Sequence, residues 1–134
     1  MKGLINTAVL VLSKKTLVAD AVKQMIYQNL NNCFVAEENQ KIVGIVTITD
    51  VIRRAFNHPK EKLNTLKLEK IMTSEVKYAS LESLEQGVRE LNEKRYSHYP
   101  VCRNESRPMT SDNLVGIITT ADIAKKHLMN CKLA

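Results

Sequence analysis

The sequence has no tryptophan, two phenylalanines and four tyrosines, and no apolar run that approaches the ~18 residues needed to cross a membrane. So few aromatic side chains leave little material for the base stacking by which single-stranded nucleic acids are bound. Asn6 and Thr7 interrupt the apolar stretch near the N-terminus, and Lys14 and Lys15 lie before any cleavage site. We therefore expect neither a signal peptide nor a membrane partner.

Cysteine is also scarce. The three cysteines, at positions 33, 102 and 131, form no C-x-x-C pair and are odd in number, which argues against a disulfide framework and a zinc ribbon. The cysteines and histidines nowhere have zinc-ligand spacing. We expect a reducing, cytoplasmic compartment and no metal site.

Motifs of catalysis are missing as well. The chain has no Gly-x-Ser-x-Gly, no glycine-rich phosphate loop, and no plausible Cys-His or Ser-His-Asp set. We therefore expect no enzyme and no catalytic cofactor.

Basic residues, by contrast, are abundant, and the net charge of +6 with a pI near 9.3 favours an anionic partner. A phosphate ligand, a nucleic acid and an acidic protein surface all satisfy that charge. The hydrophobic content of 44% over 134 residues is ordinary for a globular protein. The length suits one compact domain or two small packed halves.

One stretch occurs twice. Residues 44–50 read Gly-Ile-Val-Thr-Ile-Thr-Asp, and residues 116–122 read Gly-Ile-Ile-Thr-Thr-Ala-Asp. Each copy predicts a buried strand that enters a helix. The Thr-x-x-Asp spacing is that of a capping box, while the first turn of a helix also attracts anions. A helix cap and a ligand site both fit, and repetition of the same residue types raises the weight of the ligand site.

The first half of the chain predicts the order strand, helix, strand, strand, helix. The expected segments are a strand at 9–12, a helix over 17–30 capped by Thr16 and broken by Asn31 and Asn32, strands at 33–36 and 42–47, and a helix that follows Asp50 and stops before Pro59.

The second half repeats this order, with a short strand over 76–78 and a helix whose start carries the capping-box pair Ser83 and Gln86. Gly87 would let that helix approach a neighbour closely. The copies are offset by 66 residues at Cys33 (99 − 33) and by 72 at the motif (116 − 44). Six extra residues therefore lie in the second hairpin, in an exposed loop marked by Ser106, Pro108 and Ser111.

The predicted fold class is α+β, with two β-α-β-β-α repeats related by pseudo-twofold symmetry and small sheets packed with helices. We divide the chain into a first repeat at 1–58, a connector at 59–70 and a second repeat at 71–134.

Two such repeats, each with Gly-apolar-apolar-Thr-x-x-Asp, resemble a tandem cystathionine-β-synthase (CBS) domain pair, or Bateman module. The likeness covers residues from about 5 to 128, and Ile71-Met72-Thr73 and Tyr96-Ser97-His98-Tyr99-Pro100-Val101 add to it. It implies a regulatory module that is not a catalyst and that binds AMP, ADP, ATP or S-adenosylmethionine in clefts between the repeats.

The resemblance also implies roles for residues. The motif aspartate would accept hydrogen bonds from ribose hydroxyls, the threonine would bond ribose or phosphate, and the residue after glycine would line the adenine pocket. One site would comprise Asp50, Thr47, Thr49, Ile45, Thr73 and Val76, and the other Asp122, Thr119, Ile117, Thr7 and Leu10. His98 lies where the family often has a basic residue that contacts phosphate.

The chain departs from the family pattern at three places. Ala121 stands where the first copy has Thr49, Phe34 replaces the proline seen at Pro100, and Asn6 replaces the methionine seen at Met72. We therefore rank the Asp50 site above the Asp122 site.

Three functions follow as hypotheses. The first is a nucleotide-sensing module that forms a homodimer through exposed apolar residues of the helices after each aspartate: Ile52, Phe56, Ile123 and Leu128. The second is a ligand-free module that regulates or scaffolds a protein partner. Nucleic-acid binding through the basic surface ranks last, because no nucleic-acid motif accompanies the charge.

Overall fold

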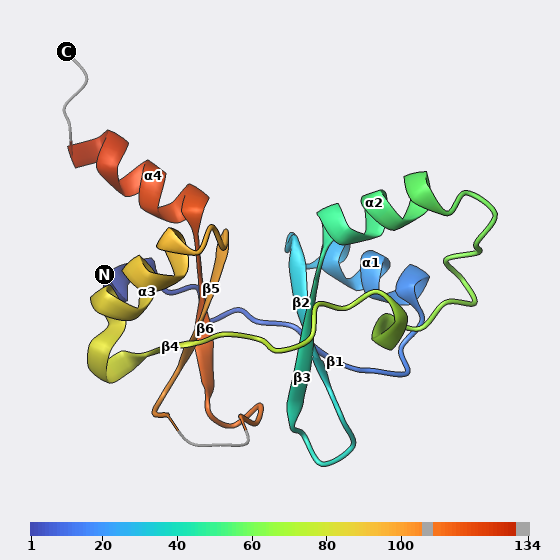
Figure 1. Cartoon of the computed structure of the whole chain (residues 1–134), viewed down its shortest axis with the longest axis horizontal. Coiled ribbons are helices and arrows are strands. Elements are labelled where there is room, and N and C mark those ends of the chain that lie inside the picture. The colour runs from blue at the N-terminus through green and yellow to red at the C-terminus, as the bar shows by residue number, and fades with distance from the viewer. Residues whose placement is uncertain (106–108, 131–134) are drawn as a thin grey trace. The chain divides into compact units, whose positions relative to one another are not determined.

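The computed structural model describes residues 1–105 and 109–130, and the chain forms two compact units. One unit is Val9–Val76, and the other joins Met1–Ala8 to Lys77–Ala134 (Figure 1). The loop residues Ser106 and Pro108, and Cys131, lie outside the described residues. The division of the sequence into two repeats and a connector stays a prediction.

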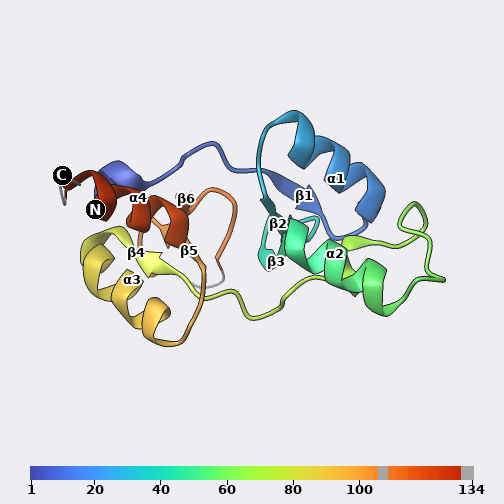
Figure 2. The same ribbon diagram turned by 90° about the horizontal axis from the view of Figure 1, so that it is seen from above.

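The Val9–Val76 unit has the predicted order of elements. They are β1 (Val11–Ser13), α1 (Val18–Tyr27), β2 (Asn32–Ala36), β3 (Ile42–Thr47), α2 (Ile48–Asn57) and the short 3₁₀ helix η2 (Leu68–Lys70). The sheet order is β1-β2-β3, with β1 parallel and β3 antiparallel to β2. Both α1 and α2 lie on one side of this sheet (Figures 1 and 2). The core includes the fully buried side chains of Val18, Met25, Val35, Val46 and Leu68.

The second unit repeats the first. Its elements are η1 (Lys2–Leu4), β4 (Ala79–Ser80), η3 (Leu81–Ser83), α3 (Leu84–Glu93), β5 (His98–Cys102), β6 (Leu114–Thr119) and α4 (Thr120–Asn130). Its sheet order is β4-β5-β6, with the same parallel and antiparallel pairing. The core includes Val88, Leu91, Tyr99, Val101 and Ile118. The predicted α+β fold of two β-α-β-β-α repeats is confirmed.

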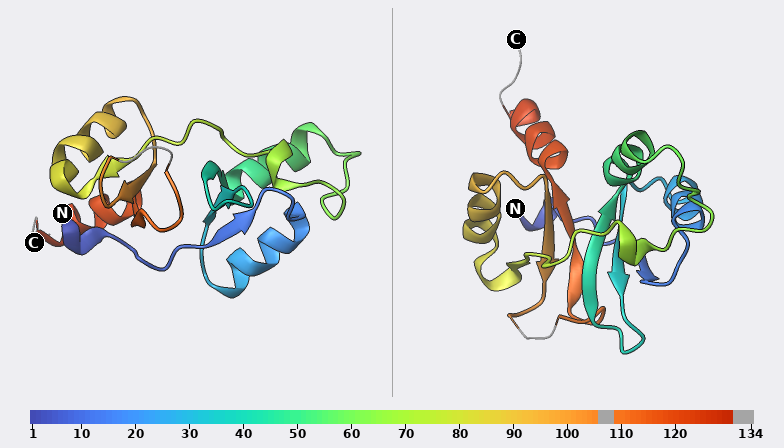
Figure 3. Two further views of the ribbon diagram at one scale, coloured as in Figure 1. Left: turned by 90° about the horizontal axis from the view of Figure 1, so that it is seen from below. Right: turned by 45° about the vertical axis from the view of Figure 1, so that its right-hand side comes forward.

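The six extra residues belong to the second hairpin, between Arg103 and Asn113, but Ser111, which we expected to be exposed, is half-buried. In the first hairpin the Glu37 amide donates to the Lys41 carbonyl at 2.9 Å, and in the second the Arg103 amide donates to the Asn113 carbonyl at 2.8 Å. Glu37 corresponds to Arg103 at an offset of 66, and Lys41 corresponds to Asn113 at an offset of 72. Both hairpins can be followed in the right-hand view of Figure 3.

The predicted cap of α1 is wrong. The helix begins at Val18, and no side chain caps it. Instead, the Val18 amide donates to the Leu66 carbonyl at 2.7 Å and the Ala19 amide to the Leu63 carbonyl at 3.0 Å. Because a distant segment satisfies the first-turn donors, the Thr16 hydroxyl is not needed there.

The predicted end of α1 is also wrong, since the helix stops at Tyr27 and Asn32 already belongs to β2. Asn29 adopts a left-handed φ of 56°, and the Leu30 amide donates to the Met25 carbonyl at 2.8 Å. This is a Schellman ending, which needs a left-handed residue just past the helix. Helix α3 ends in the same way at Arg95, with φ of 67°.

The predicted position of the first strand of the second repeat is wrong, because β4 comprises Ala79–Ser80 and excludes Val76 and Tyr78. In the first unit the Phe34 amide donates to the Leu10 carbonyl at 2.8 Å. The equivalent of Phe34 is Pro100, which has no amide hydrogen to donate. The parallel ladder therefore cannot extend toward Val76.

The predicted capping box of α3 does not form. Ser83 is the N-cap residue but makes no cap hydrogen bond, and η3 precedes it. The Gln86 side chain donates to Glu90 at 3.2 Å instead. The prediction for Gly87 agrees with the structure, since a Cβ there would lie 3.0 Å from the Cβ of Ala79.

Candidate functional site

The first motif forms the junction between β3 and α2, where Thr47 is the N-cap of the helix. The Asp50 amide donates to Thr47 Oγ1 at 3.1 Å, and the Thr47 amide donates to Asp50 Oδ2 at 2.9 Å. These reciprocal bonds are a capping box, as the spacing predicts. They fix the aspartate side chain against the end of the strand.

The second motif has the same geometry between β6 and α4. The Thr119 amide donates to Asp122 Oδ2 at 3.0 Å, and the Asp122 amide donates to Thr119 Oγ1 at 3.3 Å. The Thr119 hydroxyl also donates to Asp122 Oδ2 at 2.9 Å. The helix cap is therefore present in both copies.

Each aspartate keeps one carboxylate oxygen outside its cap. The hydrogen bonds that the two carboxylates accept within their caps go to Oδ2, and Oδ1 of Asp50 and of Asp122 receives no hydrogen bond from the described part of the chain. Both side chains are half-buried. A carboxylate oxygen accepts hydrogen bonds from hydroxyl groups, so one aspartate can cap its helix and bind a ligand hydroxyl at once.

We call Ile45, Thr47, Asp50 and Thr73 the Asp50 cluster. Ile45 and Thr73 exchange backbone hydrogen bonds, of 3.1 Å from the Ile45 amide and 2.9 Å from the Thr73 amide. The Thr73 side chain is exposed. The segment after the connector thus runs along the outer edge of β3, beside the motif.

Two further predicted residues lie near this cluster in the sequence. Thr49 is exposed in the first turn of α2, and Val76 is half-buried three residues after Thr73. Both belong to the Val9–Val76 unit.

The glycine of the first motif makes room for the edge pairing. A Cβ at Gly44 would lie 2.5 Å from Met72 Sδ and 3.0 Å from Met72 Cβ. Contacts this short would force the Met72 side chain to shift. Gly44 therefore lets the Met72 side chain lie in its present place against β3, next to the pairing of Thr73 with Ile45.

We call Ile117, Thr119 and Asp122, with Asn6 at the strand edge, the Asp122 cluster. The Asn6 amide donates to the Ile117 carbonyl at 2.9 Å, and the Ile117 amide donates back to Asn6 at 3.0 Å. A Cβ at Gly116 would meet the Asn6 carbonyl and the Ile5 side chain. The N-terminal segment thus lies on β6 as the post-connector segment lies on β3, and the predicted Thr7 follows it, exposed.

The residue opposite each motif threonine comes from the neighbouring strand. Asn32 pairs with Thr47, and His98 pairs with Thr119. Directly opposed side chains in an antiparallel pair lie on one face of the sheet. His98 therefore belongs beside the Asp122 cluster, with Ser97 Oγ 3.0 Å from His98 Nδ1. Sequence reasoning gave Asn32 no role, although its offset of 66 from His98 was a usable signal.

Leu10 differs from the other predicted site residues. It belongs to the Val9–Val76 unit, whereas Asp122 belongs to the other unit. Its side chain is 8% exposed and packs in the core with Val18 and Leu68.

The basic pairs after each aspartate are not equally available to a phosphate. Arg54 makes a bidentate ion pair with Glu61, with nitrogen to oxygen distances of 2.8 and 3.0 Å. Arg53, Lys125 and Lys126 are exposed. Of the first pair, Arg53 is the better placed to meet an anion.

Apolar residues on α2 and α4 are exposed in part. The exposed fractions are 48% for Ile52, 79% for Phe56 and 54% for Leu128. Ile123 is half-buried and packs against the core of its unit, so its predicted exposure is wrong. Its equivalent at an offset of 72, Val51, is buried in the same way.

The buried ionisable groups are unsuited to reaction. Burial raises the pKa of the Cys33 thiol to about 12, which keeps it protonated and unreactive at neutral pH. Burial, with a smaller effect of Cys102, raises the pKa of the Tyr78 phenol. In residues 1–105 and 109–130 no group of three His, Cys, Asp or Glu side chains is placed to hold a metal ion.

Among the described residues, no helix has the length and apolar character needed to cross a membrane.

Comparison with known proteins gives a family match. The family model for the CBS domain matches residues 1–57 and again residues 68–128. An uncharacterized 17.7 kDa protein of Acidianus ambivalens is 25% identical over 124 residues, which are 92% of this chain and 70% of that protein.

Solved structures are similar over nearly the whole chain. The CBS domain pair of protein MJ0100, in complex with 5′-methylthioadenosine and S-adenosyl-L-methionine, has a TM-score of 0.75 and 25% identity, covering 96% of this chain and 95% of that one. A hexameric CBS-CP12 protein from bloom-forming cyanobacteria has a TM-score of 0.75 and 26% identity, covering 93% of this chain and 66% of that one.

Proposed function

Because the chain belongs to the CBS domain family, as a tandem pair, we propose that it is a regulatory module that binds an adenosine-containing ligand. The candidates are AMP, ADP, ATP and S-adenosylmethionine. The Asp50 cluster is the primary site and the Asp122 cluster the secondary one. Binding changes the conformation or the assembly of the protein, and the chain itself is not a catalyst.

The observation that carries this proposal is the free carboxylate oxygen of each motif aspartate. Oδ2 of Asp50 is held in the helix cap, so the side chain is fixed before any ligand arrives. A ribose presents two vicinal hydroxyls, and a fixed carboxylate can accept from them without losing side-chain freedom. The MJ0100 pair, which carries 5′-methylthioadenosine and S-adenosyl-L-methionine, supports the choice of adenosyl ligands.

We rank the Asp122 cluster second because of the first turn of α4. Thr49 gives the Asp50 cluster an exposed hydroxyl, and the equivalent residue is Ala121. His98 lies beside the Asp122 cluster and would contact a phosphate there. The Asp122 cluster therefore depends more on a phosphate group than the Asp50 cluster does.

A thermal-shift panel of AMP, ADP, ATP, S-adenosylmethionine and 5′-methylthioadenosine tests the proposal. A ligand that binds only the native state stabilises it by about 2.7 kcal/mol at a hundred times its Kd. At least one ligand should raise the Tm of the wild type. Asp50→Asn should reduce the shift, whereas the control Asp20→Asn, on an exposed residue of α1, should keep it.

The exposed apolar residues of α2 favour a second role in assembly. Phe56 is 79% exposed and Ile52 48% exposed one turn earlier on the helix, and apolar side chains gathered on a surface mark contact sites. We propose a homodimer through this surface and Leu128. If the chain instead regulates or scaffolds a protein partner without a ligand, the partner should co-purify with it. Asp50→Asn should then leave the binding of that partner unchanged.

A further inference from the structure

Residues 72–76, which we call the edge segment, pair with β3 through one backbone bridge, and the Met72 side chain packs against the core of the unit. The reciprocal bonds between Ile45 and Thr73 form an isolated bridge and not a ladder. Thr73, Ser74 and Glu75 are exposed, and Glu75 has a left-handed φ of 56°. A segment with a single backbone bridge and three exposed residues opens at a lower free energy than a strand paired along its length.

The residues just before the edge segment are firmly anchored. Leu68 is fully buried in the core, and its amide donates to the Thr16 carbonyl at 2.9 Å. The Glu69 amide donates to the Lys14 carbonyl at 3.1 Å. Motion of the edge segment is therefore separated from motion of the connector that precedes Leu68.

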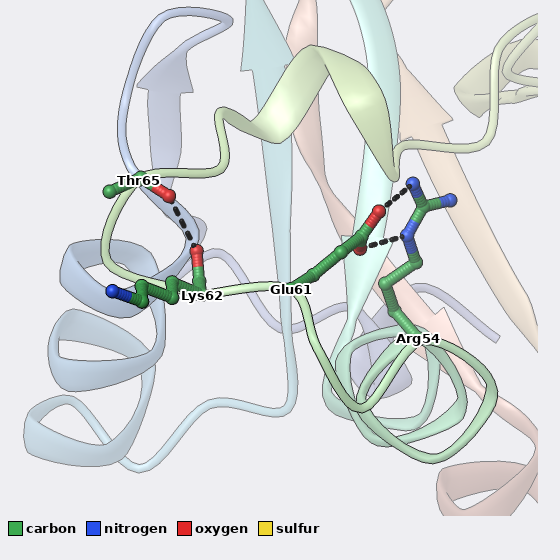
Figure 4. Close-up of polar contacts among 4 residues, drawn as sticks. All are labelled: Arg54, Glu61, Lys62 and Thr65. Atoms are coloured by element: carbon green, nitrogen blue, oxygen red, sulfur yellow. Dashed lines mark hydrogen bonds and ion pairs between the residues drawn. The ribbon is translucent and has the colours of Figure 1, made fainter.

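The connector is attached separately to α2 near its start, through Glu61. Figure 4 shows the Arg54 guanidinium of α2 facing the Glu61 carboxylate, with both nitrogen to oxygen contacts drawn. The Thr65 hydroxyl donates to the Lys62 carbonyl at 3.0 Å within the same loop. Breaking this ion pair should loosen residues near 61 but not those beyond Leu68.

We propose that docking of the edge segment on β3 is coupled to ligand occupancy of the Asp50 cluster, and that Gly44 is the positioning residue that permits docking. This inference rests on the proposed function. The docked state places Thr73 next to Ile45, so a ligand that contacts Thr73 as well as Asp50 binds only that state. Occupancy then closes the edge segment, and a loosened edge segment weakens binding by the same factor.

Two variants undock the segment by different routes. Gly44→Ala places a Cβ 2.5 Å from Met72 Sδ and 3.0 Å from Met72 Cβ, so the Met72 side chain must shift. Met72→Ala removes the packed side chain without a clash, which keeps the test available if Gly44→Ala does not fold. Gly3→Ala is the matched control, because a Cβ there has no neighbour within 4 Å. Glu61→Gln breaks the distant ion pair.

Exchange of the Ile45 and Thr73 amide hydrogens, followed by NMR with and without the adenosyl ligand that gives the largest thermal shift, reports docking directly. We expect ligand to slow both exchanges in the wild type. Gly44→Ala and Met72→Ala should speed both exchanges and raise the ligand Kd about tenfold, within the usual range of coupling. Gly3→Ala and Glu61→Gln should leave exchange at these two amides and the Kd unchanged.

The outcomes separate this inference from the proposed function. Ligand binding that leaves exchange at Ile45 and Thr73 unaltered would overturn the coupling alone. Faster exchange in both variants with an unchanged Kd would overturn it too. If the wild type binds no adenosyl ligand, the proposed function fails and the coupling fails with it.

Discussion

In our proposal Asp50 combines two tasks, helix capping and ligand binding, in one carboxylate. Oδ2 accepts the Thr47 amide hydrogen, and the other oxygen remains open to a ligand. The sequence predicted both tasks but could not choose between them, because a capping box and a ribose site require the same residue types. The geometry makes the two tasks compatible, since the cap uses Oδ2 alone and the proposed ligand would use Oδ1.

Asp50→Ala should lower the free energy of unfolding by about 1 kcal/mol, the usual net contribution of one hydrogen bond, because the Thr47 amide loses its acceptor. Asp50→Asn should cost less, because its side-chain oxygen can still accept the Thr47 amide hydrogen. Urea unfolding without ligand measures both. Equal losses in the two variants would contradict the account of the cap.

Cys33 should resist alkylation in the native protein. Burial raises its pKa to about 12, well above the ordinary value for a thiol, so the folded state holds the thiol proton more tightly than the unfolded state. Its contribution to stability is therefore complete below pH 9 and is lost as the pH rises toward 12. Iodoacetamide labelling at pH 8, read by peptide mass spectrometry, should modify Cys33 only under denaturing conditions.

Some properties of the helices and strands could be predicted from the sequence, and others could not. Their order and the two caps after β3 and β6 were predictable, because periodicity and capping depend on neighbouring residues. The start of α1 was not predictable, because the backbone amides of its first turn donate to the distant carbonyls of Leu63 and Leu66. The length of β4 was not predictable either, since it depends on Pro100 in the partner strand β5.

The candidate site could be predicted only in part, because some of its contacts join segments that are distant in the sequence. The motif residues and the pairing position of His98 follow from the repeat. The resemblance to the CBS family placed Thr73 with Ile45, which lie side by side, but no local pattern shows that Gly44 accommodates Met72. Contacts between distant segments were the part that the sequence could not supply.

Arg95→Gly should stabilise the protein through the end of α3. Arg95 has a φ of 67°, a conformation that costs a residue with a Cβ about 1–2 kcal/mol. Glycine removes that cost but loses more chain entropy on folding, so we expect a net gain of about 0.5–1 kcal/mol.

Arg89→Gly is the matched control for this substitution. Arg89 lies inside α3 with its side chain 72% exposed, and glycine there should destabilise by about 1 kcal/mol. Thermal unfolding of both variants measures the difference. A lower Tm for Arg95→Gly would contradict the assigned Schellman ending.

The whole molecule, in our proposal, works as a dimer. Phe56→Ser should raise the dimer dissociation constant about tenfold or more, because truncating a buried aromatic anchor commonly costs about 2 kcal/mol. Sedimentation velocity over a concentration series measures it. Tyr27→Ser is the control, because Tyr27 is also exposed but lies on α1, outside the proposed dimer surface, and should not matter. Equal effects of the two variants would contradict the assigned interface.

The central claim is that an adenosyl ligand binds at the Asp50 cluster, and isothermal titration with AMP, ATP and S-adenosylmethionine tests it most directly. At least one ligand should give saturable heat with the wild type. A hydrogen bond to a charged group contributes about 1.5–3 kcal/mol, so Asp50→Asn should weaken binding by about tenfold or more. Asp122→Asn should weaken it less, and Asp20→Asn should leave it unchanged. No heat from any of the three ligands, or heat that Asp50→Asn leaves unaltered, would contradict the claim.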